Sequence, residues 1–327
     1  MKKLLLALTL TISTIFGAGF GTSSEDKDVI LNNPFTGKDQ RFIIGTATET
    51  SSYYKAGTKL SNYLKGAYAA TTDGSAHNLD LLANGDINVA FVQGDVFNLW
   101  LNSHPSYASK FTVLVTERTE HVQLIMRAGM TEDDLQKKGA KVFVGLAKSG
   151  GAGSYKNMQL LEPNYIAEPI FGELDQLAIN DLVNKKYDGI IRTSHIELGN
   201  EFTLKVLANK GLYFADIDDM DLNDPITING ETKPIYNFTT QDVSKGFFNK
   251  SAKVLETRCY IVINNELTSR KQKAEIADAV ATYKESLFQW YYLVAELIKD
   301  DNVLLTECIR VIAGSSKTTI HGCKSHD

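Results

Sequence analysis

The chain has 327 residues, of which 43% are hydrophobic and 22% charged, with a formal net charge of -5 and a sequence pI of about 5.8. This length suffices for two medium-sized domains, each with its own core. An acidic chain without a basic stripe of interleaved aromatic residues is not expected to bind nucleic acid or to adhere to anionic lipid.

The N-terminal segment is typical of a secretory signal peptide. Two lysines at positions 2–3 precede the apolar stretch Leu4–Phe16, and small residues follow it. That stretch is shorter than the roughly 20 apolar residues that a membrane anchor needs. We therefore expect residues 1–21 to be removed, which leaves a periplasmic protein, although the cleavage position stays open. Since no cysteine precedes Cys259, a lipid-anchored form is excluded.

From residue 41, the apolar periodicity predicts alternating strands and helices. The first six elements are expected, strand before helix, at Arg41–Thr46, Tyr53–Ala67, Ala67–Thr72, Asn78–Ala83, Ile87–Gln93 and Asp95–Leu101. Two strands, Phe111–Thr116 and His121–Arg127, and a short helix N-capped by Thr131 follow. This order predicts a mostly parallel sheet with helices on both faces.

A second α/β unit is expected to begin near Lys141. Its elements are strands at Lys141–Gly145, Ile166–Ile170 and Asp188–Arg192, helices after Ser154 and at Leu174–Lys185, and a helix and a strand within Leu204–Phe214. Residues 218–252 are expected to be rich in loops. Thr268–Asp300 has an amphipathic pattern that predicts one long helix or two.

Two apolar strands, His121–Arg127 and Arg258–Asn264, lie where the chain is expected to pass between the units. We therefore expect a first lobe of residues 28–126 and 259–327, a second lobe of residues 127–258, and a two-strand hinge. A ligand would bind in the cleft between the lobes.

The turn after the first strand is rich in hydroxyl groups. It lies between a strand end and a helix N-terminus, which is where ligands bind in open α/β sheets and where unpaired N–H groups favour an anion. Helix capping is the alternative. The candidate ligand-binding residues of this turn are Thr46, Thr48, Ser51, Ser52 and Tyr53.

Later strand ends supply further candidates. Thr72, Ser75 and Asn78 form a turn, with Ser75 as a plausible N-cap, and a plain capped turn is an equally good interpretation. Gln93 ends a buried strand, and its side-chain amide can both donate and accept hydrogen bonds. Asp95 is instead expected to be a structural residue at the start of a helix.

A glycine-rich stretch spans residues 145–154. It lacks the Lys–Ser/Thr pair of a phosphate loop, but its backbone could form a nest for a carboxylate, with candidates Lys148, Ser149, Gly150 and Gly151. Arg192, at another strand end, could pair with a carboxylate in a bidentate manner or form a surface ion pair.

Catalytic and metal-binding patterns are weak. There is no Gly-x-Ser-x-Gly or His-Glu-x-x-His motif, and the six histidines and three cysteines lack metal-ligand spacing. We expect no catalytic residue, no metal and no cofactor, although an α/β enzyme with a novel site stays an alternative. Cys259 is expected to be a buried free thiol, while a disulfide between Cys308 and Cys323 stays open.

In order and spacing, these motifs resemble the TAXI group of TRAP-transporter solute receptors. The matching positions are Gly45-Thr46 with Tyr53-Tyr54, Gly74-Ser75 with Asn78-Leu79, Gly85-Asp86, Gln93 with Asp95, Val142 to Gly145 with Ser149-Gly150, and Leu182, Lys186 and Asp188-Gly189. The resemblance covers roughly residues 41–290.

The resemblance implies a type II periplasmic-binding-protein fold that delivers a small carboxylate, such as glutamate or 2-oxoglutarate, to an ion-driven membrane transporter. Residues 49–52 depart from it, because glycines are usual where this chain has Glu49, Thr50, Ser51 and Ser52. A ligand with an amino group therefore becomes more plausible. We expect a monomeric receptor, with an ABC importer or a sensor as the alternative partner.

Overall fold

The computed structural model describes residues 41–174, 176–194, 201–228, 230–243, 250–282 and 292–296. The expected signal peptide and the pair Cys308 and Cys323 lie outside the described residues. Cys259 is buried, as predicted, and forms no disulfide among the described residues. None of the helices in these ranges is long and apolar enough to cross a membrane.

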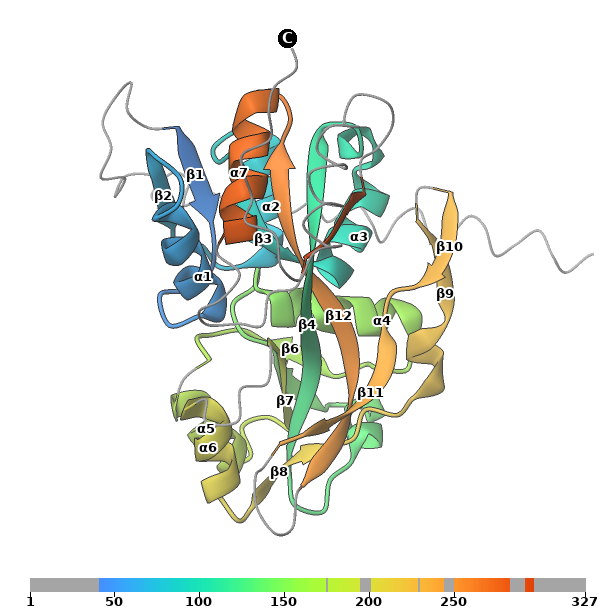
Figure 1. Ribbon diagram of the computed structural model, residues 1–327. Coiled ribbons are helices and arrows are strands. Elements are labelled where there is room, and N and C mark those ends of the chain that lie inside the picture. Colours follow the sequence, from blue (N-terminus) through green and yellow to red (C-terminus); the bar gives the residue numbers. More distant parts are fainter. Residues whose placement is uncertain are drawn as a thin grey trace, which may run out of the picture.

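The first α/β unit follows the predicted order of elements. Its parts are β1 (Phe42–Gly45), α1 (Ser52–Ser61), β2 (Ala67–Ala70), α2 (Ser75–Asn84), β3 (Val89–Gln93) and α3 (Gly94–Ser103). Strand β1 pairs in parallel with both β2 and β3, so the predicted parallel sheet is confirmed here. Figure 1 shows this sheet and its helices in the upper half of the molecule.

Two long antiparallel strands run from the upper into the lower half of the molecule in Figure 1. They are β4 (Phe111–Arg127) and β12 (Ser251–Asn264). The sequence predicted two separate strands within β4, and this was wrong, because the charged residues Glu117 and Arg118 lie in one continuous strand. The upper part of β12 pairs with β3, and the lower part of β4 pairs with β7 (Gly189–Ser194) and β8 (Leu212–Ala215).

The second α/β unit fills the lower half of the molecule. Its helices are α4 (Gly150–Leu161), α5 (Gln176–Val183) and α6 (Glu201–Ala208), and its strands are β5 (Lys141–Phe143), β6 (Glu168–Ile170), β7 (Gly189–Ser194) and β8 (Leu212–Ala215). The short helix predicted after Thr131 is a 3-10 helix, Glu132–Gln136, and Thr131 does form a capping box.

Residues 218–252 are not mainly loops, contrary to the prediction. They hold β9 (Pro225–Ile228), β10 (Glu231–Pro234) and β11 (Asn237–Asp242). Strands β9 and β10 form a hairpin, and β11 pairs with β12. The prolines misled the sequence interpretation because here they stand at strand ends, where a missing N–H group is tolerated.

The last predicted helix is shorter than expected. Helix α7 covers Arg270–Thr282, and residues Tyr292–Glu296 form a strand, β13, that pairs with β4. The prediction of helix as far as Asp300 was therefore wrong at this segment, since a short apolar run fits either helical or strand spacing.

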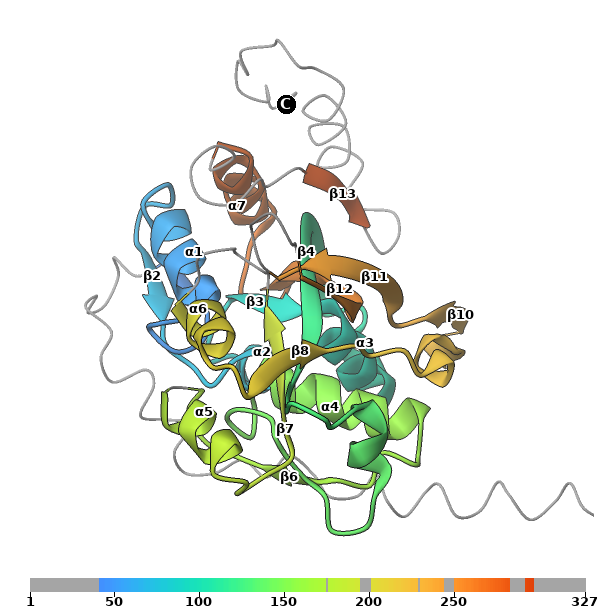
Figure 2. The same cartoon turned by 90° about the horizontal axis from the view of Figure 1, so that it is seen from below.

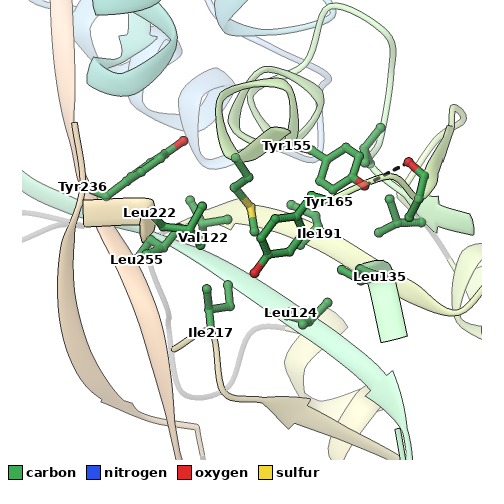
Figure 3. Close-up of a cluster of buried hydrophobic side chains, with 14 of the residues drawn as sticks. Val122, Leu124, Leu135, Tyr155, Tyr165, Ile191, Ile217, Leu222, Tyr236 and Leu255 are labelled. Atoms are coloured by element: carbon green, nitrogen blue, oxygen red, sulfur yellow. Dashed lines mark hydrogen bonds between the residues drawn. The ribbon is translucent and has the colours of Figure 1, made fainter. Parts of the chain in front are cut away.

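The buried apolar residues separate into two upper and two lower clusters. The upper clusters draw on residues 42–114 and 259–280, and the lower ones on residues 122–255. Figure 3 shows one lower cluster, with Tyr236 at its edge and its hydroxyl pointing out of the cluster. Packing of this kind is the main favourable contribution to folding of each half.

On these clusters we propose where the two lobes divide. Strand β4 passes between them from Leu114 to Val122, and β12 passes from Leu255 to Cys259. In this proposed division, β12 crosses near the boundary expected from the sequence at 258/259. Strand β4 crosses before the other expected boundary, at 126/127. Accordingly, His121–Arg127 pairs within the second lobe, and most of Arg258–Asn264 pairs within the first.

Candidate functional site

The first hydroxyl-rich turn serves partly to hold the fold together. Thr46 is fully buried, and its Oγ1 donates to the carbonyl of Ala70 at 2.6 Å. Ser51 is the N-cap of α1 and accepts from the N–H of Tyr54. Thr48 and Ser52 are partly exposed beside them. Capping, which the sequence left as an alternative, therefore accounts for Ser51.

Tyr53 reaches from α1 to the strand that connects the lobes. Its hydroxyl donates to Glu120 Oε2 at 2.5 Å, and both side chains are buried. Glu120 lies on β4 between the upper and lower clusters. Glu120 falls between the two strands that the sequence predicted here, so no sequence pattern marked it as a site residue.

The second turn holds strand ends together. The prediction that Ser75 is the N-cap of α2 was wrong, because Gly74 occupies that position. The Oγ of Ser75 instead accepts a hydrogen bond from the N–H of Gln93. Thr72 Oγ1 accepts from the N–H of Gly74. Asn78 is fully buried, and its amide donates to the carbonyls of Thr46 and Phe91. These side chains fix α2 to the ends of β1 and β3.

The glycine-rich stretch is mostly the start of α4, which begins at Gly150 with Ser149 as its N-cap. This helix lies close against the first lobe. A Cβ on Gly150 would stand 1.3 Å from Gln93 Oε1, and one on Gly153 would stand 2.5 Å from Val96. Gly151 lies against the backbone carbonyls of Val144 and Ile191. The glycines thus permit close packing between lobes, a use that the sequence interpretation as an anion-binding nest did not include.

The two remaining candidates of the second lobe, Lys148 and Arg192, interact with different parts of the molecule. Lys148 forms an ion pair with Asp80 of α2 at 3.2 Å, and its carbonyl accepts from the N–H groups of Ala76 and His77. Arg192 has its guanidinium 4.8 Å from the ring centre of Phe202. Lys148 therefore joins the lobes directly.

Asp95 is the centre of a hydrogen-bond network between the lobes. Its Oδ2 accepts from Ser154 Oγ at 2.6 Å and from the hydroxyl of Tyr236 at 2.8 Å. Ser154 in turn accepts from Thr193 at 2.9 Å, and the backbone N–H of Asp95 donates to Thr257 Oγ1 at 3.0 Å. Asp95 was expected to be structural, and its partners Ser154, Tyr236 and Thr257 were not singled out in the sequence.

The electrostatics of this network favour a neutral carboxyl group. Asp95 is completely buried, and this burial raises its pKa, while the bonds from Ser154 and Tyr236 act in the opposite direction. Burial also raises the pKa of the Tyr236 hydroxyl well above its ordinary value, and the neighbouring Asp95 adds to that effect. Two tyrosine–carboxyl pairs, one at Asp95 and one at Glu120, therefore lie where the lobes meet.

The structure thus brings part of the predicted site together. The junction combines buried polar side chains from both lobes and both crossing strands: Tyr53, Gln93, Asp95, Glu120, Ser154, Tyr236 and Thr257. Among the described residues, one cluster of three acidic side chains is close enough together to hold a metal ion: Glu162, Asp219 and Asp221. Asp221 is exposed, and exposed acidic clusters of this kind are common in proteins without a metal.

Two α/β lobes joined by two crossing strands, with polar residues between them, define the type II periplasmic-binding-protein class, so the predicted fold class is confirmed. The chain belongs to the NMT1-like family, whose model matches residues 44–240.

Three solved structures of low identity have a similar chain path. A putative L-cystine ABC transporter protein from Listeria monocytogenes is 14% identical, with a TM-score of 0.43 over 74% of this chain and 89% of its own. The ligand-binding component of an ABC-type import system from Staphylococcus aureus is 15% identical (TM-score 0.41; 75% and 72%). An ancestral arginine-binding protein is 12% identical (TM-score 0.44; 76% and 94%). Comparison with curated proteins finds no significant match.

Proposed function

We propose that the protein is an exported, non-catalytic receptor that binds a small polar organic ligand between its lobes and delivers it to a membrane transporter. The observation that carries this proposal is the concentration of buried polar side chains at the lobe junction. Burying polar groups is costly unless they are paired, so a fold rarely places so many in one region without using them.

The ligand class follows from the charges around the junction. Arg192 on β7 and Glu120 on β4 offer opposite charges, and Gln123, which lies directly opposite Arg192 in the strand ladder, is fully buried. We propose a small carboxylate or an amino acid, in the range of glutamate and 2-oxoglutarate. Thr48, Ser52 and Tyr53 would contact it from the first lobe, and Arg192 from the second.

The transport partner is proposed on the motif resemblance. We favour a TRAP-type secondary transporter of the TAXI group, a periplasmic location and a monomeric receptor. An ABC importer or a sensor protein is the second choice of partner, which neighbouring transporter genes would distinguish.

A thermal-shift and calorimetry screen of amino acids and carboxylates tests the proposal. A ligand at a hundredfold excess over its Kd stabilises the folded protein by about 2.7 kcal/mol, which raises the melting temperature measurably. The bound compound should be recovered chemically unchanged. A complete set of small amino acids and carboxylates without any shift would contradict the receptor function.

A matched pair of arginine variants locates the binding. Arg192→Met should reduce the affinity for the compound identified in the screen at least tenfold. Arg41→Met removes an arginine that instead pairs with Glu275, remote from the junction, and should leave affinity unchanged. Equal effects of the two variants would argue against a site at Arg192.

A further inference from the structure

The contact between α3 and α4 contains a carboxyl group that is shared between the lobes. Figures 1 and 2 show these helices side by side, α3 from the upper lobe and α4 from the lower. Asp95 stands in the first turn of α3, and its hydrogen-bond donors Ser154 and Tyr236 both belong to the second lobe. Rotation of the lobes about β4 and β12 would separate Asp95 from these two donors.

The surroundings of Asp95 are polar but uncharged. Thr257 of β12 and Thr193 of β7 complete the network, and β9 presents only uncharged residues toward α3. Lys156 on α4 and Arg258 on β12 are exposed, and Glu256 is half-buried. Among the described residues, no cation affects the pKa of Asp95, and besides Ser154 and Tyr236 only the backbone N–H groups of Val96 and Asp95 itself act to lower it.

We propose that Asp95, Ser154 and Tyr236 form a proton-dependent latch that holds the two lobes together. An ionised carboxylate without a cation is poorly tolerated in a dry contact, whereas in separated lobes water would solvate it. Lobe contact therefore favours the protonated acid, and lobe separation favours the carboxylate.

The direction of the pH response follows from linkage. Burial raises the pKa of Asp95 when the lobes are in contact. At a pH below the ordinary aspartate range, the acid is protonated in both arrangements and the latch acts fully. As the pH rises toward the raised value, the separated arrangement releases its proton first and gains in population.

Small-angle scattering of the full chain without ligand, measured across a pH series, tests the latch. The radius of gyration of the wild type should increase as the pH rises. Asp95→Asn keeps an acceptor oxygen for Ser154 and Tyr236 and cannot ionise, so its radius should stay small at every pH. A wild-type radius that does not change with pH, or an Asp95→Asn variant that keeps the wild-type response, would overturn the proposal.

Two further variants separate the latch from general effects of buried carboxyls. Tyr236→Phe removes one donor, so it should enlarge the radius of gyration at low pH and speed hydrogen exchange at the Asp95 amide. Glu132→Gln alters another buried carboxyl that accepts from a tyrosine, Tyr165, but both partners lie in the second lobe. It should leave the radius and its pH response unchanged, and an effect equal to that of Asp95→Asn would contradict the latch. These measurements need no ligand, so their outcome is independent of the ligand screen.

Discussion

The hydroxyl of Tyr53 on α1 lies 2.5 Å from Glu120 Oε2 on β4, which joins a helix of the first lobe to the strand that leads into the second. Both side chains are buried, so loss of the donor would leave a buried carboxylate less well satisfied. Tyr53→Phe should therefore lower the free energy of unfolding by about 1–3 kcal/mol, as measured by urea denaturation.

The next residue of the same helix offers a control for this prediction. Tyr54 is partly exposed, and among the described residues no hydrogen bond of its hydroxyl is found. Tyr54→Phe should change the free energy of unfolding by less than about 0.5 kcal/mol. Equal effects at the two positions would show that the bond to Glu120 is not important for stability.

Close packing of Gly150 against Gln93 gives a second prediction. Gly150→Ala places a methyl group where Gln93 Oε1 now lies, so the end of the Gln93 side chain must leave this position in the contact between α4 and the first lobe. Because Gln93 is buried, this repacking should lower the melting temperature. The double variant Gln93→Ala, Gly150→Ala should recover much of the loss, because the clashing atoms are removed; failure of this rescue would place the strain elsewhere.

The ion pair between Lys148 and Asp80 predicts a titration shift. Burial raises the pKa of Asp80, and Lys148 opposes that effect through its charge and hydrogen bond. Lys148→Met should therefore raise the pKa of Asp80 further, as followed by carboxyl NMR. Lys141→Met, which removes an exposed partner of Glu168, should leave Asp80 unchanged.

Glu132 makes the stability of the second lobe depend on pH. Burial raises its pKa to about 7, against 4.5 as the ordinary value, despite bonds from Tyr165 and two backbone N–H groups. Because the folded state holds its proton more tightly, stability is greatest below about pH 4.5 and falls as the pH rises toward 7, by at most about 3 kcal/mol.

Urea denaturation at several pH values checks this contribution. Glu132→Gln should flatten the decline between pH 4.5 and 7, because it removes the titrating group. Glu49→Gln, at an exposed position, should keep the wild-type profile. If the Glu132 variant also kept that profile, the group would not be the source of the decline.

The fold was largely predictable because apolar spacing is a local property. The first-lobe helices and strands come in the predicted order, and the strand ends lie where polar residues interrupt apolar runs. The continuous strand β4 was not predictable, since Glu117 and Arg118 look like a turn in isolation. Strands β9 to β11 were missed because proline and glycine residues obscured their pattern.

The candidate site was predictable only in part, for a different reason. Gln93 ends β3, and Tyr53 stands in the first turn of the helix that follows β1, positions that sequence motifs can mark. Glu120, Ser154 and Tyr236 come from separate segments of the chain, and only tertiary packing brings each to its partner. Gly150, Gly151 and Gly153 could not be interpreted from the sequence for a similar reason. Glycine is required both by an anion-binding backbone nest and by a close contact between a helix and its neighbour.

The path of β12 also has a consequence for biosynthesis. In the upper sheet, β12 stands between β3 and β4, and it is made only after nearly all of the lower lobe has been synthesised. A nascent chain that ends near residue 250 would expose the facing edges of β3 and β4 with nothing between them. The lower lobe would also lack Ala252, Val254 and Leu255 of its buried clusters, so we expect chains truncated before β12 to be prone to aggregation.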